Sequence, residues 1–391
     1  MSNPALRAWV EIDLMALERN LRKIKNALPA GVRYMSVVKA DAYGHDAPQV
    51  VRRLRQCGVD CFCVANVREG ADVRMVCGPG VDMLVLGAVL PDEVSELAAN
   101  GLTAALSAPE EMEVLASAGA GRHGAPLPVH VKVDTGMGRL GVWHEDAPEF
   151  IRAVAANPRL ELRGVFTHFS CADDAREDAR AFTEEQRRRF VRVVESVPAA
   201  ARAKPDFLVH ADNSAGLETF TGSAEKLGKF NAVRVGLLQY GVPPRKNSLL
   251  ADLKPEPVLS FHSRIGLVKR LPAGTPISYN RTHVLKRDSQ IAIVTAGYGD
   301  GVPIPASDRA SVLIGGRRCP ILGRVTMDQT VVDVSDLPVP PRAGDLVTLL
   351  GKQNGDTIPV EEFCHWADTI PWDVFCSITK RVTRVLRGER C

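Results

Sequence analysis

The chain has 391 residues, of which 45% are hydrophobic and 24% are charged, an ordinary composition for a globular protein of two or three domains. A formal net charge of +3 over this length excludes the strongly basic character of nucleic-acid-binding proteins. No stretch approaches the roughly 18 consecutive apolar residues that span a bilayer, and the N-terminus lacks a signal-peptide pattern. We therefore expect a cytoplasmic protein that binds neither nucleic acid nor membrane.

The nine cysteines are scattered, and no Cys-x-x-Cys pair or matching histidine cluster predicts a structural metal. We expect free thiols and no metal site. The scattered histidines also lack ligand spacing, so no role is assigned to His45, His123, His130, His144, His262, His283 and His365.

A strand at 8–12 and a helix at 13–28 precede a regular alternation of strands and helices. Eight short apolar runs predict buried strands, at 32–38, 61–65, 83–86, 103–106, 129–133, 162–166, 207–210 and 232–237. Helical spacing separates these runs, and eight such units in about 240 residues fit a (β/α)8 barrel better than an open doubly wound sheet. The first turn also lacks the G-x-G-x-x-G of a dinucleotide site.

Beyond Gly241 the pattern changes to strands without long helices. The strands are predicted at 258–269, 290–295, 311–314, 319–322, 330–334 and 345–350, with one late helix at 359–367. The fold class is therefore α/β, with an N-terminal (β/α)8 barrel at 1–241 and a mainly antiparallel β domain at 242–391.

Lys39 stands at the carboxyl end of the first barrel strand, where barrels of this class collect their chemistry. A partly desolvated lysine loses its proton readily and can form a Schiff base with a carbonyl cofactor. From position alone, an ordinary surface lysine at a strand end is the favoured alternative. Other strand ends place polar residues around the same mouth, namely Asn66, Ser107, Lys132, Asp134, His168, Asn213, Ser214, Arg234 and Gly236.

The last two strand ends and the turn after the fifth strand are suited to anions. Asn213 and Ser214 begin a short helix whose amides can hold a phosphate, although they also read as simple helix caps. Arg139 lies in a glycine-rich turn, where it can hold an anion. The alternative is a turn in which Gly136 and Gly138 merely supply positive φ.

The ordered motifs of the chain resemble those of the alanine racemases, which are pyridoxal-phosphate enzymes of fold type III. The matching segments are VVKADAYGHD, KVDTGMGRLG, THFSCAD, HADNSAG, VRVGLLQYG, ISY, AGYGDG, GRVTMDQT and TIPWDVFCSITKRVTRV. The resemblance covers essentially the whole chain. It implies interconversion of L- and D-alanine, the supply of D-alanine for peptidoglycan, and a head-to-tail homodimer whose active sites each borrow a β domain.

The same resemblance implies a role for each matching residue. The cofactor, pyridoxal 5'-phosphate, is expected to contact Lys39, Tyr43, His168, Ser214, Arg234, Gly236, Leu237 and Trp372. The substrate is expected to contact Arg139, Met327, Asp328 and Tyr298. Lys132 lies beside Arg139 and matches a lysine that is carbamylated in many relatives. Lys39 and the partner's Tyr279 are the two implied bases, acting on the D and the L enantiomer respectively.

Arg234 explains why such a site would racemise. A guanidinium effectively never gives up its charge, so it donates to the pyridine nitrogen and leaves that nitrogen unprotonated. A neutral pyridine is a weak electron sink, and a short-lived carbanion favours reprotonation over decarboxylation or transamination. A fold-type III decarboxylase is disfavoured, because those enzymes place a carboxylate at this nitrogen.

Several positions depart from the pattern of the relatives. Asn280-Arg-Thr-His283 follows the tyrosine where most relatives have Gly-Ala-Thr-Tyr or similar, and Trp372 replaces a tyrosine. Gly299 and the segment 302–308 also differ from the common form. A reshaped entrance leaves a broader-specificity racemase, for example one acting on serine, as the nearer alternative. A noncatalytic pyridoxal-phosphate carrier is the more distant one, because such proteins resemble only the barrel half.

Overall fold

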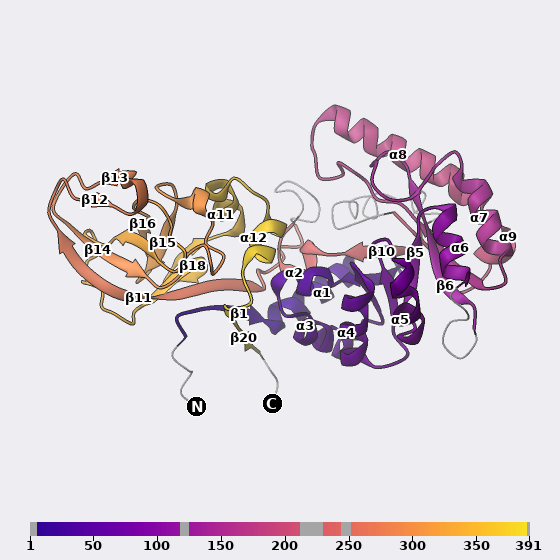
Figure 1. Cartoon of the computed structure of the whole chain (residues 1–391), viewed down its shortest axis with the longest axis horizontal. Helices are drawn as coiled ribbons and strands as arrows, with labels where there is room; N and C mark the ends of the chain where they lie inside the picture. The colour runs from indigo at the N-terminus through magenta and orange to yellow at the C-terminus, as the bar shows by residue number, and fades with distance from the viewer. Residues whose placement is uncertain (1–5, 118–124, 212–229, 244–251, 389–391) are drawn as a thin grey trace. The chain divides into compact units, whose positions relative to one another are not determined.

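The computed structural model describes residues 6–117, 125–211, 230–243 and 252–388. The chain divides into two compact units (Figure 1). The barrel unit comprises Leu17–Ala42 and Asp46–Glu256, and the β-rich unit comprises Met1–Ala16, Tyr43–His45 and Pro257–Cys391.

The barrel unit contains eight parallel strands that form a nearly closed barrel, in the sheet order β10-β2-β3-β4-β5-β6-β8-β9. Their bounds are β2 (Arg33–Val37), β3 (Cys61–Val64), β4 (Asp82–Val85), β5 (Thr103–Leu106), β6 (Leu127–Asp134), β8 (Leu160–Phe166), β9 (Leu208–His210) and β10 (Ala232–Val235). A two-residue strand, β7 (Val142–Trp143), pairs with β6. Most residues of these eight strands are buried, because barrel strands are covered on both faces. The predicted fold class is confirmed.

The helices that connect these strands follow the predicted spacing. They are α1 (Leu14–Ala27), α3 (Ala47–Gln56), α4 (Val67–Cys77), α5 (Val94–Ala99), α6 (Pro109–Ser117), α7 (Ala147–Ala156), α8 (Glu177–Ser196) and α9 (Ala199–Arg202), with 3-10 turns η1 (Pro91–Glu93) and η4 (Leu237–Tyr240). The Asp46 side chain caps α3 by accepting a hydrogen bond of 3.2 Å from the Gln49 amide. The short helix predicted from Ser214 lies outside the described residues.

The turn α2 (Lys39–Gly44) has left-handed backbone conformation, which the sequence pattern did not predict. Ala40, Asp41, Ala42 and Tyr43 have φ between 52° and 55°. Left-handed conformation costs non-glycine residues roughly 1–2 kcal/mol each. The first half of the turn is held by hydrogen bonds from the Ala42 amide to Val38 O and from the Ala47 amide to Asp41 Oδ1. The four residues that follow Lys39 therefore form a strained segment.

The β-rich unit is mainly antiparallel, as predicted. Its main strands are β1 (Ala8–Asp13), β11 (Leu259–Leu271), β14 (Ser289–Val294), β15 (Ser311–Ile314), β16 (Arg317–Pro320), β17 (Thr330–Asp333), β18 (Leu346–Gln353), β19 (Asp356–Ile358) and β20 (Thr383–Arg387). β1 pairs antiparallel with β11 and parallel with β20. Because the N-terminal strand joins this sheet, the two units do not coincide with the ranges 1–241 and 242–391.

Short elements complete the β-rich unit. They are the hairpin of β12 (Pro276–Ile277) and β13 (His283–Val284), the 3-10 turns η5 (Tyr279–Arg281) and η6 (Ile304–Ala306), and the helices α11 (Val360–Ala367) and α12 (Pro371–Ser377). The sequence pattern predicted α11 and missed α12, which begins with proline in its first turn. No helix in the described part of the chain is long and apolar enough to cross a bilayer.

Candidate active site

The carboxyl ends of the barrel strands bring together the cations that the sequence placed there. Burial lowers the pKa of His168 far below its usual value, and four cations lower it further, namely Arg234, Lys132, Arg139 and Lys39. Lys39 is half-buried directly after β2, and its charge also acts on Lys132. We call these four cations and His168 the barrel cup.

Lys132 is buried at the carboxyl end of β6, with its Nζ 5.1 Å from the centroid of the Phe166 ring. Its pKa is lowered to about 7, first by burial and then by the charges of Arg234 and Arg139. An amine with a lowered pKa is more often neutral near pH 7 than an ordinary lysine, which is the state that can act as a nucleophile.

The backbone of the turn after β6 hydrogen-bonds to Asp134, the carboxylate whose charge acts on Lys132. Asp134 Oδ1 accepts hydrogen bonds of 2.8 and 2.9 Å from the Gly136 and Met137 amides, and Oδ2 accepts one of 2.9 Å from the Gly138 amide. Gly136 and Gly138 have φ of 133° and 68°, which is the conformation that the glycines were expected to supply. Arg139 follows this turn and is exposed.

Arg234 is buried on β10 and is held by carbonyl oxygens and a histidine. Its Nη2 donates hydrogen bonds of 2.8 and 3.1 Å to the Thr167 and Ala211 carbonyls, and its Nη1 donates to His210 Nδ1. The guanidinium carbon lies 5.3 Å from the centroid of the Phe166 ring. These contacts fix the plane of the guanidinium, so its direction is set before any ligand binds.

A second histidine extends this network into the barrel interior. His210 Nε2 lies 2.9 Å from His130 Nδ1. Because Arg234 only donates, His210 Nδ1 accepts, and the His210 Nε2 proton is then donated to His130. Burial is the largest cause of the lowered pKa of both rings, and the pKa of His130 falls to about 3. Both rings are therefore neutral.

The sequence pattern assigned His130 no role, and the structure places its ring in this network. His130, Lys132 and Asp134 alternate along β6, and a period of two places their side chains on the same face of a strand. That spacing was the available signal. Gly164 on β8 makes room for the ring, because a Cβ there would lie 2.8 Å from His130 Nδ1.

The predicted β-rich-unit residues also lie together. The Tyr298 amide donates a 2.9 Å hydrogen bond to Thr326 O, and the Gly299 amide donates one of 2.9 Å to Met327 O. Ser278, next to Tyr279, donates from its hydroxyl to Arg324 O, three residues before Met327. Tyr279, Tyr298 and Met327 are 68%, 40% and 53% exposed. Such exposed apolar side chains are typical of surfaces that another molecule covers.

Arg381 holds the backbone beneath these side chains, and sequence reasoning did not assign it a role. It makes a bidentate pair with Asp300, at 2.7 and 2.9 Å, and a 2.9 Å hydrogen bond to Asp328 Oδ1. Gly299 packs close to it, since a Cβ there would lie 2.8 Å from Arg381 Nη2 and 3.0 Å from the Met327 carbonyl oxygen. The glycine at this departure from the common pattern therefore lies in a crowded place.

The remaining predicted residues occupy varied environments. Tyr43 is buried, and Gly236 and Leu237 are buried where β10 leads into η4. Trp372 lies on α12 and is 36% exposed. Ser214 lies outside the described residues. Among the described residues, no group of His, Cys, Asp and Glu is arranged to hold a metal ion.

The barrel cup fits an anionic aromatic cofactor such as pyridoxal phosphate. Its donors are lysine and arginine side chains, and Asp134, the carboxylate that acts on Lys132, is engaged by its own turn. An anion would therefore relieve the mutual repulsion of the cations.

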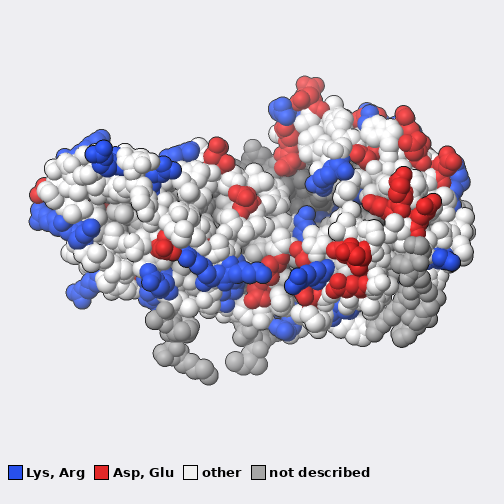
Figure 2. Space-filling model, in the orientation of Figure 1, with Lys and Arg blue, Asp and Glu red and all other residues white. Residues whose placement is uncertain are grey.

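Figure 2 shows acidic as well as basic side chains over both units on the face in view, so the net charge is not gathered in one patch of that face.

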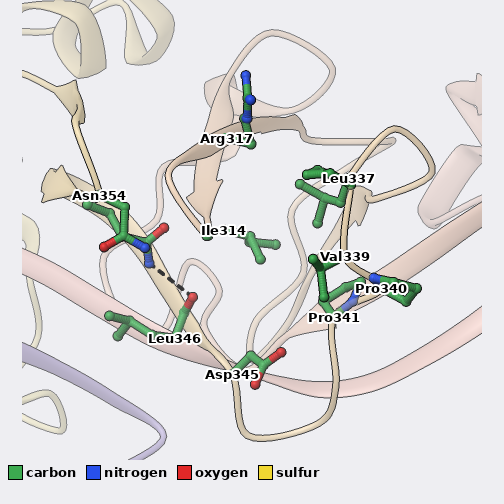
Figure 3. Close-up of a pocket in the computed structure, with 12 residues that line it drawn as sticks. Ile314, Arg317, Leu337, Val339, Pro340, Pro341, Asp345, Leu346 and Asn354 are labelled. Carbon is green, nitrogen blue, oxygen red and sulfur yellow. Dashed lines mark hydrogen bonds between the residues drawn. The ribbon is translucent and has the colours of Figure 1, made fainter.

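A hollow of about 360 Å³ in the β-rich unit is a different feature (Figure 3). The apolar side chains of Ile314, Leu337 and Val339 and the consecutive Pro340 and Pro341 line much of it. None of the described site residues contributes to its wall. The hollow is therefore not the candidate active site.

Comparison with known proteins places both units in one family. Sequence models of the alanine racemase N-terminal and C-terminal domains match residues 12–244 and 258–386. The alanine racemase of Symbiobacterium thermophilum is 40% identical over 381 residues, with 97% of each protein covered. The structure of alanine racemase from E. faecalis has a TM-score of 0.88 at 31% identity and 98% coverage of both chains. That of the Bartonella henselae alanine racemase, solved with covalently bound pyridoxal phosphate, has a TM-score of 0.84 at 26% identity, covering 97% of this chain and 99% of that one.

Proposed function

The chain belongs to the alanine racemase family and is a racemase, as its motifs predicted, and from this premise we propose that it interconverts L-alanine and D-alanine with pyridoxal phosphate and two bases. We further propose that it works in the cytoplasm as a homodimer and that its D-alanine supplies peptidoglycan. The observation that carries the proposal is the barrel cup, in which Lys39 lies among cations that an anionic cofactor would complement.

We propose that the cofactor is held from all sides of this cup. Lys39 would bind it covalently, Arg234 would donate to its pyridine nitrogen, and His168 would pack beside its ring. Its phosphate would be bound by Tyr43, Ser214, Gly236 and Leu237, with Trp372 closing the pocket. Bound pyridoxal phosphate would withdraw electrons from the substrate Cα and so acidify its proton.

The protons would be moved by two side chains, one from each subunit. Lys39 would take the Cα proton of D-alanine, and the partner's Tyr279 would take that of L-alanine from the opposite face. The exposure of Tyr279, Tyr298 and Met327 supports a second subunit, which would cover this surface. The Met327 amide, Arg139, Asp328 and Tyr298 would orient the substrate and its carboxylate.

Lys132 would tune the charge of the cup. Its pKa of about 7 leaves neutral amine available for carbamylation by carbon dioxide. The resulting anion would lie beside Arg139 and hold that guanidinium toward the cofactor's phenolic oxygen. If instead the amine stays unmodified, it would contribute a cation to the same place.

Substitution of Tyr279 by Phe tests the division of labour between the bases. The variant should lose the Cα deuterium of L-alanine far more slowly than the wild type in a single turnover, with a much smaller effect on D-alanine. The cofactor absorption serves as the control for intact binding. Equal slowing for both enantiomers would contradict the assignment.

A broader-specificity racemase is the second candidate, and Trp372 favours it because an indole is bulkier than the tyrosine of most relatives. Chiral chromatography of reactions with alanine, serine, lysine and arginine separates the two, each run with and without added pyridoxal phosphate. Alanine should be racemised fastest. A rate on serine equal to that on alanine would support the second candidate instead.

A further inference from the structure

Two segments that depart from the pattern of the relatives meet at one carboxylate in the β-rich unit. Asp308 Oδ2 accepts a 2.8 Å hydrogen bond from Thr282 Oγ1, and Asp308 Oδ1 lies 3.2 Å from His283 Nδ1. Oδ1 also accepts a 2.6 Å hydrogen bond from the Gly323 amide. Thr282 and His283 lie three and four residues after Tyr279, so Asp308 ties the loop 278–283, which carries Tyr279, to the turn at Gly323 and Arg324.

The backbone around Tyr279 is left-handed, a conformation that needs surrounding contacts such as those of Asp308 to hold it. Ser278, Asn280 and Arg281 have φ of 60°, 60° and 53°. Non-glycine residues persist in this region only where the surroundings hold them there. Asn280 replaces the glycine of most relatives, and asparagine is among the residues that tolerate left-handed conformation best. The loop is therefore strained on both sides of Tyr279.

The other end of the loop is fixed to the same turn. Ser278 Oγ donates to the carbonyl oxygen of Arg324. Gly323 has φ of 69°, and a Cβ there would lie 2.8 Å from the Ile277 carbonyl oxygen. The Gly323 turn thus contacts residues on the N-terminal side of Tyr279, while Asp308 joins it to the C-terminal side.

Asp308 can serve as an anchor because its own segment is fixed. Ala306 is buried, and its carbonyl accepts a 3.0 Å hydrogen bond from the Ala310 amide. Ser307 Oγ accepts a 2.9 Å hydrogen bond from the Val325 amide, two residues beyond Gly323. Asp308 therefore projects from a short segment that is bonded on both sides of it.

We propose that Asp308 is a positioning residue that, through Thr282, His283 and Gly323, sets the direction in which Tyr279 leaves the loop. This inference rests on the proposed function, in which Tyr279 is the base for L-alanine. It joins one departing residue of each segment, His283 and Asp308, in a single polar contact. His283, where most relatives have a tyrosine, is the partner that makes this contact an ion pair when the imidazole is protonated.

The test substitutes Asp308 by Ala in the holoenzyme and measures the Cα deuterium isotope effect in each direction. The two enantiomers have equal free energy, so kcat/KM falls by the same factor in both directions whatever step is slowed. A displaced Tyr279 slows proton removal from L-alanine. The isotope effect from L-alanine should then rise while that from D-alanine falls, together with a loss of kcat/KM of about 10-fold or more.

Isotope effects do not depend on the fraction of active enzyme, so a merely structural loss would leave both at the wild-type values. Thr282→Val removes one of the three contacts and should shift both isotope effects in the same sense, but less. Asp336→Ala, which removes an exposed ion pair with Arg287 in the same unit, should leave them unchanged. His283→Tyr should retain activity closer to wild type than Asp308→Ala does.

Three outcomes are decisive. The opposed shift of the two isotope effects in Asp308→Ala supports the proposal. Wild-type isotope effects in both Asp308→Ala and Thr282→Val overturn it, and leave the proposed function intact if Tyr279→Phe still slows proton loss from L-alanine selectively. If Tyr279→Phe shows no selective effect, the base assignment fails and the positioning role fails with it.

Discussion

The two loops that carry the proposed bases share an unusual backbone and differ in what holds it. The segment after Lys39 has four consecutive non-glycine residues at φ of 52–55°, and the loop around Tyr279 has three at 53–60°. Each such residue costs on the order of 1–3 kcal/mol. Strain of this size at both proposed bases is typical of functional sites, where the surroundings impose a geometry that the chain alone would not adopt.

The first loop is exposed at Ala40 and Asp41 but anchored by buried residues from Ala42 on, whereas the second is held by polar contacts near the surface. Ala42 is fully buried and its amide bonds to Val38 O. Tyr279 is 68% exposed, and its loop depends on hydrogen bonds to Asp308 and Arg324. Residues buried in the packed interior resist displacement, whereas a loop held by a few polar contacts near the surface is sensitive to single substitutions.

The largest effect on activity is expected from substitution of Lys39, at the start of the first loop. Lys39→Ala would remove both the proposed covalent attachment and one proposed base, so racemisation should fall on the order of 10⁴-fold. Chiral chromatography measures the rate, and the absorption of bound cofactor reports attachment. Lys352→Ala, at an exposed lysine of the β-rich unit, should leave both unchanged. Retention of activity in Lys39→Ala would refute the central role of this loop.

Arg234→Lys should have the next largest effect. Lysine cannot reproduce the fork that bonds Thr167 O, Ala211 O and His210, so kcat should fall about 10²-fold. Unlike a guanidinium, an ammonium can give its proton to the ring nitrogen, which would make the cofactor a stronger electron sink. More alanine should then be converted to pyruvate by transamination, in which the amino group passes to the cofactor, relative to alanine racemised. An unchanged ratio would show that Arg234 does not control the choice between racemisation and transamination.

The lowered pKa of Lys132 should make the stability of the cofactor-free protein depend on pH. Its folded pKa of about 7 is below the ordinary value of 10.5, so the unfolded chain binds more protons between these pH values. The free energy of unfolding contributed by this group therefore rises with pH across that window. Lys132→Met should stabilise the protein by roughly 2–4 kcal/mol at pH 6, and the gain should shrink as pH rises toward 10.

Urea unfolding at several pH values measures this gain directly. Lys352→Met is the matched exposed control and should show no such trend. A gain from Lys132→Met that is independent of pH would mean that packing, rather than the buried charge, determines the effect.

The smallest expected effect is on the exposed loop. Asn280→Gly relieves the strain at φ 60° but makes the unfolded chain more flexible, so stability should change by less than about 0.5 kcal/mol. Asn280→Ala should destabilise by about 1 kcal/mol because alanine tolerates this conformation less well. Thermal unfolding of the holoenzyme compares the two. Equal stability of both variants would argue against left-handed backbone at this position.

Local patterns were sufficient to predict the barrel and the residues at its mouth. Apolar runs marked the eight strands, and parallel strand ends necessarily gather Lys39, Lys132 and Arg234 at one rim. The features that the sequence did not predict depend on contacts between residues far apart in the chain. Asp308 reaches Thr282 and Gly323 across long stretches of chain, and the left-handed turn at 40–43 contains no glycine to signal it. β1 looked like any short strand, since only pairing with β11 and β20 assigns it to the β-rich unit.

The attachment site of the cofactor is the most direct test of the account. Purified protein would be loaded with pyridoxal phosphate, reduced with borohydride, digested and mapped by mass spectrometry. Lys132, buried with a pKa of about 7, is the competing nucleophile in the same cup. We expect a stable cofactor adduct on Lys39. An adduct on Lys132, or protein that does not retain the cofactor, would contradict it.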